Sequence, residues 1–180
     1  LDTPAKVDGS AVFGLDVRVP GMLVAQVVRP PDLGGKLASF DAKAALAVPG
    51  VVAVVEIPRG VAIVAQHFWA AQTGRKQLSI RWTPGPHGDL DNESIRKRCA
   101  EAVSKGVEVR KEGDVEGAIA NAGPKRSLEA IYDFPFLAHA TLEPMNCTAK
   151  VEAGACELWV PTQSPSAAAD AAAKILGIPA

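Results

Sequence analysis

Two runs rich in β-branched residues restrict the fold of this chain more than any other feature. Residues 51–57 read Val-Val-Ala-Val-Val-Glu-Ile, and residues 61–65 read Val-Ala-Ile-Val-Ala. Such side chains favour strands because they pack well on a pleated surface. The segment Pro58-Arg59-Gly60 between the runs is typical of a turn. The sequence therefore predicts two adjacent core strands, with a sheet at the centre of the fold.

The flanking sequence adds further strands and short helices to this sheet. We predict strands at 8–19, 22–29 and 77–82 and helices at 42–48 and 67–75 from their apolar spacing. The strand 22–29 is apolar almost throughout, which predicts burial on both faces. Asp41 can accept hydrogen bonds from the first turn of helix 42–48. Residues 1–83 thus form a strand-rich α/β module with too few helices for a doubly wound sheet.

The segment 83–88, Thr-Pro-Gly-Pro-His-Gly, interrupts both helix and strand and marks a module boundary. Beyond it, Asp91 and Asp114 can each cap a helix, and the second helix, 115–122, stops at Gly123-Pro124. We predict that residues 84–125 form a linker with two helices that bridges two modules.

The last segment, 126–180, combines strands with one helix. We predict a strand at 127–134, then a β-hairpin of 141–152 and 156–160 with its turn at Ala153-Gly154. A final helix begins at Ser164-Pro165, where serine accepts from free amides and proline fits the first turn, and it ends at Gly177.

Composition argues against several classes of protein. The 19 basic residues nearly balance the 20 acidic ones, so no strong field gathers nucleic acid. No apolar run approaches the roughly 20 residues of a membrane helix, and the first residues do not follow the basic-then-apolar pattern of a leader, so we expect neither a membrane span nor a targeting signal in the sequence as given. The chain starts at Leu1 without methionine and stops just after a helix-ending glycine. We expect it to be a piece cut from a longer protein.

The three cysteines, Cys99, Cys147 and Cys156, are too few and too separate to hold the fold together. With the hairpin turn at 153–154, Cys147 lies roughly 13 Å along the strands from Cys156. We therefore expect no disulfide between them. The same separation argues against a zinc site made of His139 and these two cysteines.

Residues 134–147 carry the polar side chains most worth weighing for chemistry. The segment is rich in apolar residues, so we expect a buried loop whose polar groups find partners. His139 and Glu143 are candidates for a proton-handling pair; the alternative, which the residues alone favour, is that both tie down loop backbone. Gln163 and Ser164 can bind an anionic cofactor group at a helix N-terminus, or they can simply cap that helix.

An ordered series of motifs over about residues 5–83 resembles the α/β-hammerhead domain of the xanthine dehydrogenase/aldehyde oxidase family. The segments are 6–16, 20–23, 28–31, 40–46, 49–54, 61–65 and 68–71. Residues 135–149 and 159–165 resemble the start of the molybdenum-cofactor-binding domain of the same family. The variant Pro-Phe-Leu-Ala-His-Ala-Thr-Leu-Glu-Pro-Met-Asn-Cys is most similar to the large (beta) subunits of isoquinoline 1-oxidoreductase-like enzymes.

The resemblance implies an α/β (α+β) fold, with the hammerhead domain in 1–83 and the first hairpin and helix of the cofactor domain in 126–180. It further implies a hydroxylase that inserts water-derived oxygen beside a ring nitrogen or at an aldehyde, with a molybdopterin cytosine dinucleotide cofactor in the full subunit. Electrons pass to a small [2Fe-2S] subunit in such enzymes. The remainder of the large subunit and a small-molecule substrate are the other implied partners.

The chain also departs from the family pattern. The glutamine that relatives carry near the metal corresponds here to Leu137, six residues before Glu143. The glycine-rich cofactor loop and the glutamate base lie downstream in relatives, so we expect this fragment to bind no cofactor and to be inactive alone. An aldehyde or carbon monoxide-type hydroxylase, and a stand-alone protein-interaction scaffold, are the alternatives. The compartment, bacterial cytoplasm or periplasm, is left open.

Overall fold

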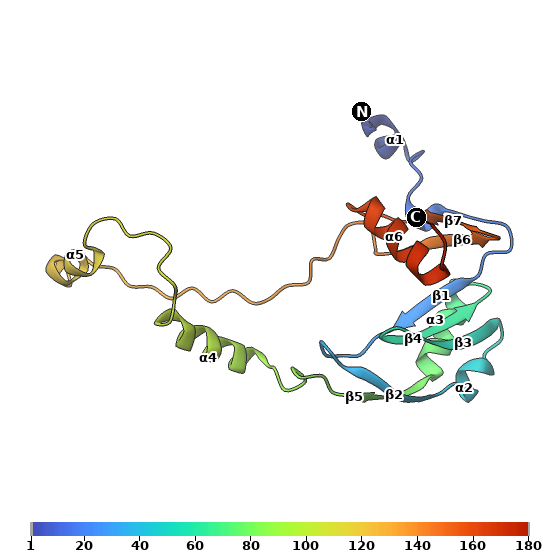
Figure 1. Ribbon diagram of the computed structural model, residues 1–180, viewed down its shortest axis with the longest axis horizontal. Helices are drawn as coiled ribbons and strands as arrows, with labels where there is room; N and C mark the ends of the chain where they lie inside the picture. Colours follow the sequence, from blue (N-terminus) through green and yellow to red (C-terminus); the bar gives the residue numbers. More distant parts are fainter. Residues whose placement is uncertain (1, 180) are drawn as a thin grey trace.

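The centre of the fold is a three-stranded antiparallel sheet in the order β1–β4–β3. A computed structural model describes residues 2–179 and shows this sheet at one end of the molecule (Figure 1). Strands β3 (Val51–Ile57) and β4 (Gly60–Ala65) pair across Pro58-Arg59, as the β-branched runs predict. Strand β1 (Val24–Val28) pairs with the other edge of β4. The predicted α/β class is confirmed.

The core lies where helix α3 (Phe68–Gln77) covers one face of this sheet. Val61 and Ile63 of β4 are completely buried, and Ala70 and Ala71 of α3 are almost so. Gly74 allows the close approach, because a Cβ there would lie only 2.9 Å from Val51 Cγ2. The body is therefore a small two-layer α/β unit with its apolar interior between β4 and α3.

Short helix α2 (Lys43–Leu46) precedes β3 and packs beside α3. The backbone amide of Lys43 donates to Asp41 Oδ1 at 2.9 Å, so Asp41 accepts from the first turn as predicted, although Ala42 occupies the N-cap position. The helix is shorter than the predicted 42–48. Its one buried side chain, Ala45, completes the small apolar layer next to α3.

A second sheet joins β2 (Lys36–Asp41) and β5 (Ser79–Thr83), and β2 was not predicted. The pairing shifts register between Leu37 and Ser39. Leu37 and Phe40 are both half-buried although they are three residues apart. This bulge removes the strict alternation by which a half-buried strand is identified in sequence.

Two predictions for the N-terminal region are wrong. Residues 8–19 form no strand: α1 (Thr3–Asp8) ends at Gly9, and a 3₁₀ turn η1 covers Gly14–Asp16. The Asp16 carboxylate accepts from the Phe13 amide at 3.0 Å and holds this turn. Strand β1 is not buried on both faces either, because α3 covers only one face and Val27 on the other is exposed.

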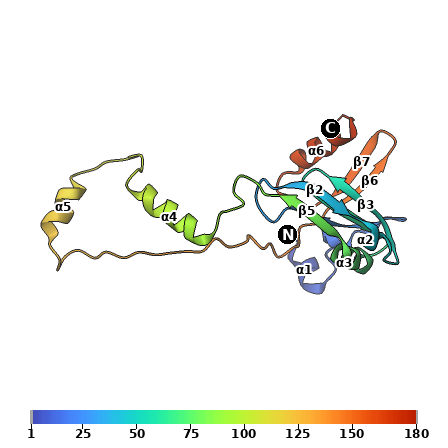
Figure 2. The ribbon, with the colours of Figure 1, turned by 90° about the horizontal axis from the view of Figure 1, so that it is seen from below.

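Residues 84–147 leave the body as a long projection, here called the arm, which carries α4 (Asn92–Val103) and α5 (Val115–Ala122) (Figures 1 and 2). Both predicted caps are confirmed, with the Ser94 amide 2.7 Å from Asp91 Oδ1 and the Gly117 amide 3.0 Å from Asp114 Oδ1. The returning limb contains no strand at 127–134, and the loop 134–147 is mostly exposed rather than buried. Both of these predictions are wrong for the described chain.

After the arm, β6 (Thr148–Glu152) and β7 (Ala155–Trp159) form the predicted hairpin, with Val151 opposite Cys156 as expected. The first strand is shorter than the predicted 141–152. Helix α6 (Pro165–Leu176) packs on β7 and ends at left-handed Gly177. The Ser164 side chain makes no capping bond, contrary to prediction; its backbone amide instead donates to Thr162 Oγ1. No helix within residues 2–179 is long and apolar enough to span a bilayer.

Candidate functional site

Glu143 connects the end of the arm to the N-terminal segment. The Gly14 amide donates to Glu143 Oε1 at 2.9 Å, across 129 positions of sequence. A Cβ on Gly14 would lie only 2.4 Å from Asn146 Oδ1, so Gly14 packs directly against this side chain. We call this contact the Gly14–Glu143 latch. It fixes the chain entering the β6–β7 hairpin relative to η1.

Local bonds shape the loop that carries Glu143. Thr141 Oγ1 donates to the Glu143 carbonyl at 2.7 Å, and Asn146 Nδ2 donates to the Pro144 carbonyl at 2.8 Å. Asn146 Oδ1 is buried and has no hydrogen-bond partner within the described chain. Such an atom costs free energy unless a partner or an ordered water satisfies it. The loop is therefore held by its own side chains and by the latch.

His139 does not join this arrangement. It is exposed on the returning limb of the arm, and no hydrogen bond links it to Glu143 within residues 2–179. Its neighbour Ala140 has φ 35°, a left-handed conformation that costs a non-glycine residue energy. In this structure the Glu143 carboxylate binds the backbone amide of Gly14. The two candidates for a proton-handling pair, His139 and Glu143, are not brought together.

Gln163 and Ser164 lie at the start of α6 and are both exposed. Beside them an open groove of about 560 Å³ separates β7 from α6. Its walls are mainly small and apolar, and include Leu158, Val160 and the alanine-rich side of α6. Thr162 and Pro165 line this groove, whereas the two candidates between them do not. The start of α6 is thus open to an anionic group but has no enclosing pocket.

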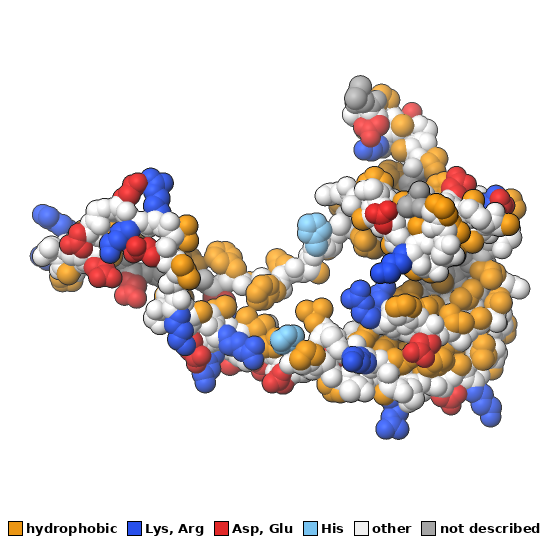
Figure 3. Space-filling model, viewed as in Figure 1, with side chains coloured by type: hydrophobic (Ala, Val, Ile, Leu, Met, Phe, Trp, Pro, Cys, Tyr) orange, Lys and Arg blue, Asp and Glu red, His pale blue; other side chains and the backbone are white. Residues whose placement is uncertain are grey.

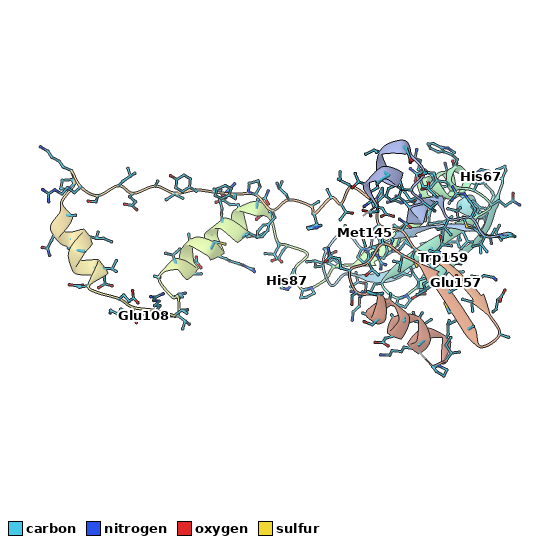
Figure 4. All side chains as sticks on the ribbon, turned by 90° about the horizontal axis from the view of Figure 1, so that it is seen from above. His67, His87, Glu108, Met145, Glu157 and Trp159 are labelled. Atoms are coloured by element: carbon cyan, nitrogen blue, oxygen red, sulfur yellow. The ribbon has the colours of Figure 1, made fainter. Side chains whose placement is uncertain are left out.

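The described residues do not form a metal centre. No group of three or more His, Cys, Asp or Glu side chains within residues 2–179 converges on one point. His67 accepts a hydrogen bond from the Ala70 amide and caps α3, while His87 lies where the arm leaves the body (Figure 4). All three cysteines are free, as predicted. Partial burial, and secondly the charge of Cys156, raise the pKa of the Cys147 thiol, so its metal-binding thiolate form is disfavoured.

The latch predicts a graded response to substitution at Glu143. Glu143→Ala removes the acceptor of the Gly14 amide, and a bond to a charged group contributes about 1.5–3 kcal/mol. We expect the Gly14 amide to exchange on the order of 10-fold faster, as measured by hydrogen–deuterium exchange. Glu143→Gln keeps an acceptor oxygen and should give an intermediate rate. Exposed Glu129→Ala is the control, and an unchanged Gly14 rate in Glu143→Ala would show that the latch does not form.

The fold and the sequence both match known proteins. The structure resembles the crystal structure of the Cu,Mo-CO dehydrogenase in its carbon monoxide-reduced state, with a TM-score of 0.60 and 19% identity over 99% of this chain and 29% of that one. Residues 97–180 match the molybdopterin cofactor-binding domain family. The structural likeness shows a shared mixed α/β fold, and the family match shows that residues 97–180 resemble a molybdopterin cofactor-binding domain.

Two curated relatives identify the family more closely. The chain is 33% identical to the beta subunit of isoquinoline 1-oxidoreductase from Brevundimonas diminuta, over 98% of its own length and 24% of the relative. It is 34% identical to a nicotinate dehydrogenase subunit from Pseudomonas putida, over 92% of its length and 14% of the relative. The chain belongs to this family of molybdenum-binding oxidoreductase subunits. It spans at most about a quarter of the length of these relatives.

Proposed function

We propose that this chain is the hammerhead domain and the start of the cofactor-binding domain of a molybdenum hydroxylase that acts on N-heterocycles. The supporting observation is the alignment with the isoquinoline and nicotinate enzymes over nearly the whole chain. In the proposed net reaction, water replaces a C–H hydrogen next to the ring nitrogen by OH. Two electrons and two protons are released, and the electrons pass to a small [2Fe-2S] partner subunit.

Within this subunit we assign residues 1–83 to the hammerhead domain, 84–125 to a linker with two helices and 126–180 to the start of the cofactor domain. The body around β4 and α3 would then serve as a rigid support. The latch would fix the chain at 143–146 to that support. This division assigns the described residues a positioning role.

The cofactor in this proposal is a molybdenum pterin, as molybdopterin cytosine dinucleotide. The residues of this chain do not by themselves fit such a group: Gln163 and Ser164 are exposed, and no enclosing cradle surrounds them. We therefore assign no chemical step to this chain. Gln163, Ser164 and the first amides of α6 would contribute at most one wall of a pterin site completed by other parts of the subunit.

The test uses the complete subunit, expressed with its partner subunits, and the 180-residue chain beside it. We expect stoichiometric molybdenum and dye-linked oxidation of isoquinoline or nicotinate in the complex, with ¹⁸O from labelled water in the product. The 180-residue chain should show neither molybdenum nor turnover. Oxidation of aldehydes or carbon monoxide only would overturn the substrate class. A complete protein without molybdenum would favour the scaffold alternative.

A further inference from the structure

The returning limb of the arm carries an alternating pattern that no part of the described structure uses. Along residues 128–136, Leu128, Ala130, Tyr132, Phe134 and Phe136 occupy every second position. In an extended chain alternate side chains share one face, so these five residues define an apolar face. The positions between them are Glu129, Ile131, Asp133 and Pro135, so the other face, here called the polar face, carries two carboxylates beside one isoleucine and one proline. This is the pattern of a strand with one face toward an apolar core.

The side chains of this face are open to solvent. Leu128 is 95% exposed, and Phe134 and Phe136 are 81% and 83% exposed. Figure 3 shows hydrophobic side chains along the arm away from the packed body. Soluble proteins rarely leave a contiguous row of large apolar side chains uncovered. The row therefore marks a surface that another element covers.

The backbone of the same segment is also unpaired. Within residues 2–179, no main-chain amide or carbonyl of 128–137 takes part in a hydrogen bond, and Pro135 is the one position of the segment without an amide to donate. The segment runs as a long extended coil in two perpendicular views (Figures 1 and 2). Asp133, on the polar face, forms an ion pair with Arg96 of α4. The segment thus offers unpaired backbone groups like those of an edge strand. Its polar face is held to α4 by the Asp133–Arg96 ion pair, which leaves the apolar face free.

Two observations indicate where the covering element comes from. The match to the cofactor-binding domain begins at residue 97, within α4, so it includes the whole of this segment. The likeness to the molybdenum dehydrogenase covers 99% of the chain and therefore also includes the arm. The arm is thus part of a shared fold, and the curated relatives are at least about four times as long as the aligned chain.

From these observations we propose that residues 128–136 dock as a β-strand on the edge of a sheet formed by the remaining part of the same polypeptide. The inference rests on the proposed function in so far as that proposal makes the chain part of a longer subunit. Main-chain hydrogen bonds hold the strand, and its five apolar side chains pack on the core beneath that sheet. The arm then ties the hammerhead body into the cofactor-binding domain.

The test compares amide exchange of peptides covering 128–137 in the 180-residue chain and in the complete subunit. In the short chain we expect coil-like exchange and a monomer by light scattering. In the complete subunit the same amides should exchange more slowly by a factor on the order of 100 or more, because exchange then requires the sheet to open. Coil-like exchange in a folded complete subunit would overturn the proposal. So would a dimer of the short chain in which these amides are protected.

A matched pair of variants tests the face. Phe134→Ser should raise exchange of the segment in the complete subunit at least about 10-fold, while Glu129→Ser on the polar face should not. Ala130→Ser, a milder change on the apolar face, replaces Phe134→Ser if that variant does not fold. Equal effects on both faces would overturn docking through the apolar face.

Molybdenum is measured in the same samples, so that the two proposals can fail separately. A protected strand without molybdenum contradicts only the proposed function, and loaded enzyme with an unprotected strand contradicts only this inference.

Discussion

Replacing Gly60 by alanine should lower the free energy of unfolding of the 180-residue chain by about 3 kcal/mol, near the upper end of the usual cost of overpacking. Gly60 opens β4, and a Cβ there would lie 2.2 Å from the Val28 carbonyl oxygen. That oxygen belongs to the backbone of β1, at the Val28–Val61 pair. The clash can be relieved only if β1 moves away from the central strand.

The measurement is urea or thermal unfolding followed by circular dichroism, in which such a loss lowers the melting temperature by roughly 10 °C. Gly106→Ala is the matched control, because its Cβ would meet nothing closer than the Val103 carbonyl at 3.8 Å and its φ is not positive. We expect the control to be neutral or to gain up to about 1 kcal/mol. A melting temperature for Gly60→Ala equal to that of the control would contradict the close packing of β1 on β4.

The β6–β7 hairpin shows which features of this fold are encoded locally. Gly154 adopts φ 79°, a turn conformation that glycine reaches without cost, and it fixes Val151 opposite Cys156. The register was therefore predictable from the dipeptide Ala153-Gly154 alone. The helix caps at Asp91 and Asp114 were predictable for the same reason: each carboxylate bonds an amide only three residues away.

Failures occurred where local bonds or distant partners outweigh apolar alternation. At 8–19 the alternation suggested a strand, but the bond from the Phe13 amide to Asp16 and the left-handed Gly9 turn the chain instead. At 127–134 the alternation is present but no partner strand lies within the described residues. A strand forms only when a neighbouring strand pairs with it. Apolar alternation therefore predicted a strand at 8–19 that the structure replaces by turns, and a strand at 127–134 that is left exposed and unpaired.

The candidate site shows the same limit. Glu143 was identified as a residue of interest from its neighbours in sequence, yet its partner is the amide of Gly14, 129 positions away. A backbone amide leaves no signature in a sequence pattern. The requirement for a glycine at 14 arises from contact with Asn146, which is equally remote. Spacing therefore indicated that Glu143 has a role but could not distinguish proton transfer from tethering.

The largest effect on stability is expected from Ile63→Ala, at about 2–5 kcal/mol. Ile63 is completely buried in the central strand β4 and lies under α3, and it is one of the two largest fully buried side chains among the described residues. Removal of its side chain leaves a cavity between the two layers of the body. Ile175→Ala is the matched control, because Ile175 is 81% exposed on α6. In unfolding experiments on the 180-residue chain the control should change stability by less than about 0.5 kcal/mol.

A second substitution tests whether the stability lost in Ile63→Ala comes from the contact between β4 and α3. Gly74→Ala places a Cβ 2.9 Å from Val51 Cγ2 and 3.2 Å from Ile63 Cγ2, so alone it overpacks the same interface. In the double variant with Ile63→Ala, the close contact between the new Cβ and Ile63 Cγ2 is removed. The new Cβ also fills part of the cavity that Ile63→Ala leaves. The double variant should therefore lose at least about 0.5 kcal/mol less than the sum of the single losses. Strict additivity in this cycle would mean that α3 does not pack on Ile63, and the two-layer body would have to be rejected.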